Sequence, residues 1–363
     1  MMHNATPMTE SLQSVAPRRL ERNVPLAPLT TIEIGGPARL FVRAETVDEI
    51  RETIAWADLN QEPLFVLGGG SNLLIADSGF DGLVLQIDLR GITVRDESSE
   101  AVTIYVAAGE RWDDFVSFAV DRGWAGIECL SGIPGLTGAT PIQNVGAYGQ
   151  DVSETIIGVE AIERATGRVV TLTNWDCGFG YRQSIFKSAA KDRYIVAGVT
   201  FRLIPGGAAR IRYPELQTYL DEQRIAVSDL RGVRDAVIAI RKRKGMVLDP
   251  SDPDTRSDGS FFMNPVLSQE QFDTFLARAG ANVPHFPSGD QIKLSAAWLI
   301  EHAGFHKGFV HGNVGLSSKH TLAVINRGGG TAREVLGLVT MIQRRVRERF
   351  GVEIQPEPNF IGF

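Results

Sequence analysis

The stretch that decides the fold is LFVLGGGSNLLIADSGFDGLVLQIDL, residues 64–89. It predicts an apolar strand, a glycine turn at Gly68, Gly69 and Gly70 that continues into Ser71 and Asn72, and a second apolar strand beyond a further glycine turn. Glycine lets backbone amides approach a ligand closely, and successive amides in a tight turn bind anions. The stretch therefore indicates a phosphorylated ligand.

Two familiar phosphate-binding motifs do not fit this turn well. A dinucleotide-binding G-x-G-x-x-G turn opens a helix, whereas here Leu73 occupies the third glycine position and strand-like sequence follows. A Walker loop needs a Gly-Lys pair, and no lysine follows within reach. A glycine turn without any ligand is the remaining alternative.

Length and cysteine content bound the class of protein. A chain of 363 residues is long enough for two or three structural units with a deep site. Its two cysteines, Cys129 and Cys177, show neither C-x-x-C nor Cys/His spacing. This usage suits a reducing cytoplasm, argues against a structural metal and predicts two small buried side chains.

The charge pattern argues against two kinds of partner. A formal net charge of −6 gives no general attraction for nucleic acid or for anionic lipid. No run of apolar residues approaches the length of a membrane span, and the N-terminus has no apolar segment of the signal-peptide kind. We expect a soluble cytoplasmic protein with a short disordered leader over residues 1–22.

The residues before the opening stretch predict a strand and a helix. Residues 38–44 alternate as a strand, and Thr46 with Glu49 can form a capping box. The helix that follows would bury Ile50, Ile54 and Ala57. Upstream, residues 31–34 read as a strand that ends in a Gly-Gly-Pro turn, which places a second glycine turn near the first strand.

The next part of the chain predicts a second α+β unit and a long loop. Residues 102–109 read as a strand and residues 111–123 as an amphipathic helix. The stretch LSGIPGLTGATPIQNVGAYGQ, residues 130–150, follows without a single charge. Loops of this length inside compact domains are usually functional, and an uncharged, amide-rich loop suits the flank of a large flat cofactor.

Beyond this loop the predicted secondary structure changes from strands to helices. The predicted strands are residues 159–162, 169–172, 195–203 and 210–213. The predicted helices are residues 232–243, 269–279, 295–303 and 331–350. We expect a domain boundary near residue 222.

Four single residues have both an ordinary and a functional interpretation. Arg182 is a surface arginine or a site residue in a glycine-rich turn, and Lys244 is a helix C-terminal cation or a diphosphate ligand. Ser260 caps a turn or acts as a hydroxyl in dry surroundings; it is not a nucleophile elbow, because Asp258 and Phe262 occupy the glycine positions of G-x-S-x-G. Glu357 is solvated or held in place by flanking prolines. The histidines show no ligand spacing, so no metal is expected.

Seven motifs together resemble the UDP-N-acetylenolpyruvoylglucosamine reductase family, whose members are flavoenzymes of bacterial peptidoglycan synthesis. The motifs are TTIEIGGPA, VLGGGSNLL, LSGIPGLTGATPIQNVGAYGQ, GYRQSIFK, GSFFMNP, AAWLIEHAG and QPEPNFIG, in the family's order. The resemblance runs from about residue 23 to the C-terminus, and a tyrosine segment at Tyr213 is similar to the first of the family's two types. Two departures are Pro214, where glycine is expected, and a longer acidic connection over residues 246–258.

The resemblance implies an α+β fold with a two-part FAD-binding domain of the vanillyl-alcohol-oxidase type and an α+β substrate-binding domain. The implied divisions are FAD-binding subdomains at residues 23–90 and 91–222, a substrate domain at 223–350 and a returning C-terminal segment at 351–363. FAD would lie between the two subdomains. The implied cofactor-binding residues are Gly68, Gly69, Gly70, Ser71, Asn72, Gly132, Gly135, Gly138, Thr140 and Gly146.

The resemblance also implies the chemistry. NADPH would reduce FAD and leave, and the enolpyruvyl ether of UDP-N-acetylglucosamine would take its place in the same site. The implied catalytic residues are Arg182 and Glu357, which stabilise an enolate-like state, and Ser260, which donates a proton. Tyr213, Lys244 and Asn264 match the positions that bind the UDP-sugar. We expect a monomer.

Two other functions remain open at this point. An FAD-dependent oxidase of the same fold would act on an alcohol or a sugar, but it leaves Ser260 and Glu357 without a role. A non-catalytic nucleotide-binding protein would not hold FAD. Rapid reoxidation by oxygen alone would favour the first, and a colourless protein that does not take up FAD would favour the second.

Overall fold

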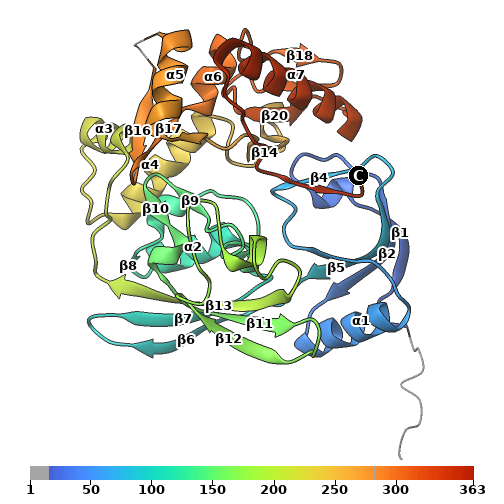
Figure 1. The fold of residues 1–363 in the computed structure, drawn as a ribbon. Coiled ribbons are helices and arrows are strands. Elements are labelled where there is room, and N and C mark those ends of the chain that lie inside the picture. The colour runs from blue at the N-terminus through green and yellow to red at the C-terminus, as the bar shows by residue number, and fades with distance from the viewer. Residues whose placement is uncertain (1–15, 281–282) are drawn as a thin grey trace, which may run out of the picture.

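A computed structural model describes residues 16–280 and 283–363 of the protein. Figure 1 shows a small sheet from the N-terminal part of the chain, a larger sheet from its middle and a C-terminal domain above both. Residues 1–15 of the expected leader lie outside the described residues. Its last part, Glu21 and Arg22, already belongs to strand β1 (Glu21–Pro25).

The first sheet has the strand order β1-β2-β5-β3. Strands β2 (Pro37–Ala44), β5 (Phe80–Ile87) and β3 (Leu64–Leu67) run parallel, and β1 pairs with β2 in antiparallel fashion. Helix α1 (Val47–Leu59) begins at the predicted capping box of Thr46 and Glu49, and its predicted apolar face is buried. A 3-10 turn, η1 (Ala27–Leu29), separates β1 from β2.

The stretch 64–89 forms more strands than predicted. After β3 and the glycine turn comes a short extra strand, β4 (Leu73–Ile75), before β5. Strand β4 pairs in parallel with β21 (Asn359–Ile361) near the C-terminus. A strand this short has little periodicity of its own, and its partner lies far along the chain, so local sequence could not identify it.

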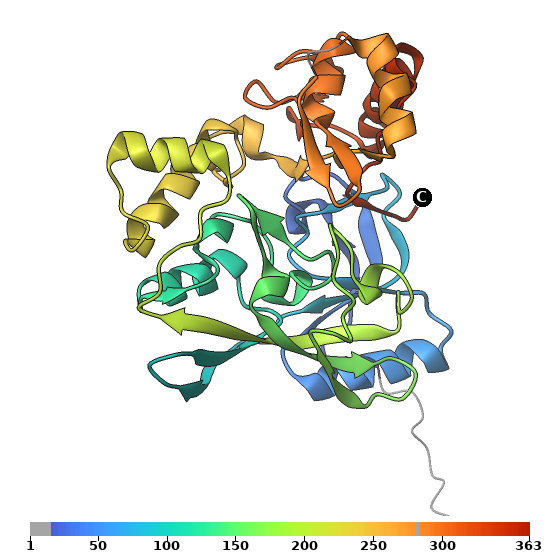
Figure 2. The same cartoon turned by 60° about the vertical axis from the view of Figure 1, so that its left-hand side comes forward.

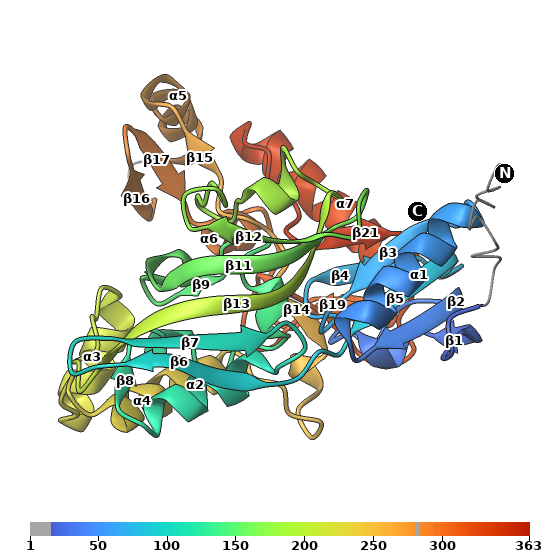
Figure 3. The same cartoon turned by 90° about the horizontal axis from the view of Figure 1, so that it is seen from below.

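The second sheet has the order β12-β11-β13-β7-β6 and is antiparallel. Figure 3 shows these long strands from below, beside the first sheet. The predicted strands and helix of this part are confirmed. The elements are β6 (Ile92–Glu97), β7 (Val102–Ala107), α2 (Trp112–Val120), β8 (Trp124–Ala125), β11 (Ile156–Glu163), β12 (Val169–Thr173) and β13 (Tyr194–Pro205), with β8 added alongside β13.

The uncharged loop lies between β8 and β11 and has only short ordered pieces. These are η2 (Glu128–Leu130), η3 (Thr137–Ala139), the β9–β10 pair (Gly146–Ala147 and Gln150–Asp151) and η4 (Val152–Glu154). A further 3-10 turn, η5 (Ile185–Lys187), follows the Gly180–Gln183 bridge between β12 and β13. The expected loop is therefore confirmed.

Two helices beyond β13 pack on the second sheet's unit. Helix α3 (Pro214–Gln223), which was not predicted, and helix α4 (Leu230–Arg243) bury Leu216, Leu220 and Val233 in the same core as Trp112 of α2. Figure 2 shows both helices apart from the C-terminal domain. The boundary near residue 222 stays a prediction, and this packing favours a boundary after α4.

The C-terminal domain combines three predicted helices with strands that were not predicted. Helices α5 (Gln269–Ala279), α6 (Ala296–His302) and α7 (Ala332–Phe350) are confirmed. One sheet has the order β14-β20-β19-β18 and the other β15-β17-β16. Their bounds are β14 (Ser257–Ser260), β15 (Val266–Leu267), β16 (His285–Ser288), β17 (Gln291–Leu294), β18 (Val310–His311), β19 (Val314–Leu316) and β20 (Ala323–Asn326).

Two predicted strands are wrong. Residues 31–34 alternate as expected, with Ile32 and Ile34 buried in the C-terminal core, but their backbone bonds to Gly70 and to the side chain of Asn326 instead of to a strand. Residues 210–213 form no strand, and Arg212 bonds to the Gly149 carbonyl and to Glu154. Tertiary contacts replace the sheet in both places.

The acidic connection after α4 is tied to the C-terminal domain. It contains η6 (Pro253–Thr255). Asp252 pairs with Lys319, and Asp254 accepts from the Ser318 hydroxyl at 2.5 Å and from its amide at 3.0 Å. The acidic residues therefore fasten this connection to the turn before β20.

The first amides of α7 donate to a carboxylate from the N-terminal part of the chain. Asp77, just after β4, accepts from Ala332 N at 2.7 Å and from Arg333 N at 3.1 Å. We expect Asp77→Ala to lower the free energy of unfolding by about 1 kcal/mol, because a helix N-terminus loses its anionic partner. Urea unfolding measures this, with exposed Asp96→Ala as the control. Equal stabilities of the two variants would contradict the role of Asp77.

Candidate active site

A cavity of about 840 Å³ lies where the first sheet, the second sheet and the C-terminal segment meet. Its wall includes the turn 68–73, residues 133–136 and 138–140 of the uncharged loop, Phe186 with Lys187 of η5, and residues 359–362. Of the predicted cofactor residues, the following line it: Gly68, Gly69, Gly70, Ser71, Asn72, Gly135, Gly138 and Thr140. The paired glycine-rich segments therefore do face one space.

Two predicted cofactor residues lie outside this wall. The amide of Gly132 donates to Asp113 Oδ1 at 2.5 Å, and the carbonyl of Gly146 accepts from Arg182 Nη2 at 2.5 Å. Both glycines shape the loop instead of lining the cavity. Sequence alone does not tell which glycine of a loop faces a ligand.

The glycines of the turn are required by close backbone contacts. A Cβ on Gly69 would lie 2.7 Å from Gly135 Cα, and a Cβ on Gly70, whose φ is +62°, would lie 1.9 Å from the Leu29 carbonyl oxygen. The cavity thus has a rim of bare backbone and apolar walls that include Ile133 and Ile142. A rim that presents amides and walls that are apolar fit a diphosphate joined to a flat ring system, as in FAD.

Arg182 and Glu357 meet beside this cavity. Arg182 Nε lies 3.5 Å from Glu357 Oε1, and the two side chains are 21% and 15% exposed. Arg182 has a φ of +52° in the Gly180–Gln183 bridge, and its terminal nitrogens donate to the carbonyls of Asn144 and Gly146. An arginine in this left-handed conformation is uncommon and is held here by its loop contacts.

The carboxyl of Glu357 has a shifted pKa. Burial raises the pKa of Glu357, while the charges of Arg182 and Lys187 and a hydrogen bond from Gln143 oppose that rise. Burial also lowers the pKa of Lys187. A carboxyl whose pKa is raised by burial keeps its proton to higher pH than an exposed glutamate does, which suits a group that donates a hydrogen bond.

The chain segments of Ser260 and Glu357 run side by side. Ser260 ends β14 and precedes the buried pair Phe261 and Phe262. The amide of Glu357 donates to the Phe261 carbonyl at 2.9 Å, and Phe262 bridges to Pro356. The structure therefore brings the three predicted catalytic residues, Arg182, Ser260 and Glu357, into one region.

The predicted substrate-binding residues fall into two places. Tyr213 packs edge-on against Tyr148 at 5.3 Å between ring centroids, and Lys244 Nζ lies 5.9 Å from the centre of the Tyr148 ring and 2.5 Å from Glu215 Oε2. Burial raises the pKa of Tyr148 to about 12. Asn264 lies in the C-terminal domain, where its Oδ1 accepts from the amide of Ala296 at 2.9 Å.

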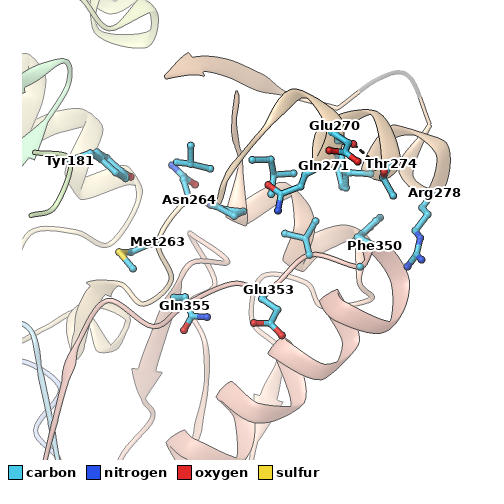
Figure 4. Close-up of a pocket in the computed structure, with 16 residues that line it drawn as sticks. Tyr181, Met263, Asn264, Glu270, Gln271, Thr274, Arg278, Phe350, Glu353 and Gln355 are labelled. Atoms are coloured by element: carbon cyan, nitrogen blue, oxygen red, sulfur yellow. Dashed lines mark hydrogen bonds between the residues drawn. The ribbon is translucent and has the colours of Figure 1, made fainter. Parts of the chain in front are cut away.

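A second cavity of about 840 Å³ opens next to Asn264. Figure 4 shows Tyr181, Met263 and Asn264 at one end and Arg278 at the other. The groove runs between α5 and the segment that follows α7. Tyr181, the neighbour of Arg182, thus connects this groove to the Arg182–Glu357 pair.

Several residues at the site were missed from the sequence. Gln143, Lys187 and Phe360 line the main cavity, and Tyr148 and Glu215 contact Lys244. Gln143 and Tyr148 lie in the uncharged loop, which was the available signal. No local pattern marked Glu215, because its partner Lys244 lies 29 residues further along the chain, just after α4.

The described part of the chain has neither a metal-binding cluster nor a membrane-spanning helix. Within residues 16–280 and 283–363, no three His, Cys, Asp or Glu side chains gather so that they could bind a metal ion. No helix of that part combines the length and apolar character that a membrane crossing requires.

The fold and the cavity define an FAD-binding flavoprotein oxidoreductase, and a model of the FAD binding domain matches residues 38–173. A model of the C-terminal domain of UDP-N-acetylenolpyruvoylglucosamine reductase matches residues 250–361. The chain belongs to the UDP-N-acetylenolpyruvoylglucosamine reductase family. The predicted α+β fold class, the enzyme class and the FAD cofactor are thereby confirmed.

Relatives of that name cover nearly the whole chain. The enzyme from Thermobifida fusca is 49% identical over 94% of this chain and 98% of its own length. The enzyme from Streptomyces coelicolor is 46% identical over 96% of this chain and 93% of its own. A crystal structure of UDP-N-acetylenolpyruvylglucosamine reductase from Thermus caldophilus superposes with a TM-score of 0.64 at 25% identity, covering 94% of this chain and 99% of that one.

The close contact of Gly69 with Gly135 yields a prediction. Gly69→Ala should weaken FAD binding at least about tenfold, because the new methyl group forces the two loops apart at the cavity rim. Titration of the apoprotein with FAD, followed by flavin fluorescence, measures the affinity. The control is Gly158→Ala in β11, where the added Cβ lies 3.6 Å from its nearest neighbour. Unchanged affinity in Gly69→Ala would show that the rim can relax.

Proposed function

We propose that the protein reduces UDP-N-acetylglucosamine enolpyruvate to UDP-N-acetylmuramate with NADPH, as a step in peptidoglycan precursor synthesis. The observation that carries the proposal is the Arg182–Glu357 pair at the FAD cavity, beside the strand that ends in Ser260. A cation and a protonatable acid next to a hydroxyl match the needs of adding a hydride and a proton across a carbon–carbon double bond.

The main cavity supplies the binding of FAD. The turn 68–72 would bind the diphosphate through its amides, and the loop residues Gly135, Gly138 and Thr140 would flank the rest of the cofactor. When bound, FAD supplies a two-electron carrier that takes a hydride from NADPH and passes it to the terminal vinyl carbon of the substrate. NADPH and the enolpyruvyl substrate would then use the same side of the cavity in turn.

The chain's own residues would stabilise the charge that builds on the substrate. Hydride addition to the terminal carbon of the enolpyruvyl double bond pushes negative charge onto the adjacent carbon and its carboxylate. Arg182 would stabilise that charge electrostatically, and protonated Glu357 would donate a hydrogen bond to it. The Ser260 hydroxyl would then donate a proton to the adjacent carbon, which completes the reduction.

The UDP part of the substrate would bind through Tyr213, Lys244 and Asn264. Lys244 is a point charge on a flexible stem and is 31% exposed beside Glu215, so a diphosphate can compete for it. Asn264 and Tyr181 lie at the end of the second cavity nearest Arg182. We also propose that the enzyme works as a monomer in the cytoplasm, where its two free cysteines stay reduced.

The proton-donor role of Ser260 gives a first test of this function. Ser260→Ala should slow oxidation of the reduced flavin by UDP-N-acetylglucosamine enolpyruvate by about 10²–10⁴-fold, because general-acid catalysis is lost. Flavin reduction by NADPH should keep its rate. Anaerobic stopped-flow absorbance measures both half-reactions.

The control for this test is Ser251→Ala on the exposed acidic connection, which should leave both half-reactions unchanged. Turnover of Ser260→Ala at the native rate would exclude the proton-donor role. Native protein whose reduced flavin reacts rapidly with oxygen but not with the enolpyruvyl substrate would instead indicate an oxidase.

The diphosphate site gives a second test. Lys244→Ala should raise KM for the UDP-sugar by about ten- to a hundredfold, because one charge-assisted contact is lost, and Tyr213→Phe should raise it less. Steady-state kinetics with varied UDP-sugar measure this. The control is Lys242→Ala, an exposed lysine in the last turn of α4, just before Lys244. An unchanged KM in both site variants would mean that the diphosphate binds elsewhere.

A further inference from the structure

Gln143 connects the cofactor turn to the carboxyl of Glu357. Its carbonyl Oε1 accepts from Asn72 Nδ2 at 2.9 Å, and its Nε2 donates to Glu357 Oε1 at 3.3 Å. Since Asn72 donates to the oxygen of the Gln143 amide, the nitrogen of that amide must face Glu357. Gln143 therefore acts on Glu357 only as a hydrogen-bond donor.

Asn72 itself is held from both of its ends. Its backbone carbonyl oxygen accepts from the backbone amide of Asn359 at 3.0 Å, where β4 meets β21. Its side-chain Nδ2 also lies 3.4 Å from the carbonyl oxygen of Glu357. The orientation of the Gln143 amide is thus imposed by the turn that lines the cofactor cavity.

One hydrogen-bond donor and one cation lie against the same oxygen of the Glu357 carboxyl. Gln143 Nε2 and Arg182 Nε lie 3.3 Å and 3.5 Å from Oε1. Within the described residues, no hydrogen bond reaches Oε2. A proton on this carboxyl group is disfavoured at Oε1, because that oxygen accepts from Gln143 and lies against the Arg182 cation.

The charged and titratable groups around Glu357 come from three elements. Arg182 and Tyr181 belong to the turn before η5, and Lys187 belongs to η5 itself. Asp151 of β10 lies 3.9 Å from the far side of Arg182 and shares its charge. The segment of Ser260 brings uncharged residues only, from Gly259 to Pro265.

We propose that Gln143, held by Asn72, is a positioning residue that directs the proton of Glu357 to Oε2. Oε2 is then the oxygen that donates to the carboxylate of the bound substrate, while Oε1 stays fixed by Arg182 and Gln143. This inference rests on the proposed role of Glu357 in the reduction. It also means that the turn that lines the cofactor cavity orients the acid.

The sign of the expected pH effect follows from the donor. A hydrogen bond to Oε1 favours the charged carboxylate, so its removal raises the pKa of Glu357 further and keeps the group protonated to higher pH. In Gln143→Leu the alkaline limb of the flavin-oxidising half-reaction should therefore move up by about one pH unit. Its rate below that limb should fall at least about tenfold, because Oε1 loses its hydrogen-bond donor and the proton is no longer directed to Oε2.

Gln143→Glu is the sharper variant because it keeps size and keeps the acceptor for Asn72. It replaces the donor by a carboxylate, so two carboxyl groups share one region and the alkaline limb should move up by more than in Gln143→Leu. Gln269→Glu on the exposed start of α5 adds the same charge elsewhere and should move nothing.

A second readout does not depend on turnover. The carbonyl stretch of protonated Glu357, identified in infrared difference spectra by its absence in Glu357→Gln, should persist to higher pH in Gln143→Leu than in the native protein. Flavin absorbance and reduction by NADPH verify that each variant is folded and loaded.

The outcomes separate this inference from the proposed function. If the infrared pH midpoint of Glu357 and the alkaline limb are both the same in Gln143→Leu as in the native protein, the role of Gln143 is overturned. This holds even if the variant turns over more slowly. If native reduced protein is not oxidised by UDP-N-acetylglucosamine enolpyruvate, the proposed function fails, while the infrared midpoint still decides whether Gln143 controls the proton on Glu357.

Discussion

The close contact of two backbone segments, the glycine turn after β3 and the uncharged loop, is the constraint on which the site depends. Gly69 and Gly135 approach so closely that no side chain fits between them. The turn 68–72 and the uncharged loop therefore line one cavity instead of two separate grooves. The same loop continues to Gln143, so the geometry of cofactor binding and the geometry of the acid are set by one piece of chain.

The two cations of the site, Arg182 and Lys244, are held in different ways. The terminal nitrogens of Arg182 donate to the carbonyls of Asn144 and Gly146, and its Nε makes the ion-pair contact with Glu357. The arginine therefore stays fixed when the carboxyl changes protonation. Lys244 is different, because its partner Glu215 lies on the half-exposed surface, where an ion pair contributes little and exchange is easy.

The sequence predicted the elements that carry their own local signals. The helices after Thr46, Ser268 and Thr331 begin at capping boxes, and their apolar faces are buried as the periodicity requires. Strands of two to four residues such as β4, β15 and β19 have no such signal, because their pairing depends on distant partners. Residues 31–34 had the correct alternation but bond to Asn326 and Gly70, which local sequence cannot reveal.

The site was predictable to a similar degree. Motif order predicted Arg182, Ser260 and Glu357 as catalytic residues; that role stays a prediction, and the structure places their segments in one region. The roles of Gly132 and Gly146 could not be read from the sequence, because a glycine that shapes a loop and a glycine that faces a ligand look alike. Gln143 was missed because an amide in a loop gains its meaning only from the groups on either side of it.

The pairing of β4 with β21 also bears on how the molecule folds. Asn72 and Glu357 are 285 residues apart in the chain, yet their segments lie in one small parallel ladder. Closing so long a loop costs entropy that is recovered only after the intervening residues are ordered. The glycine turn and its subdomain can collapse early through α1 and the parallel strands. The carboxyl group that completes the site is therefore expected to arrive in one of the last steps of folding.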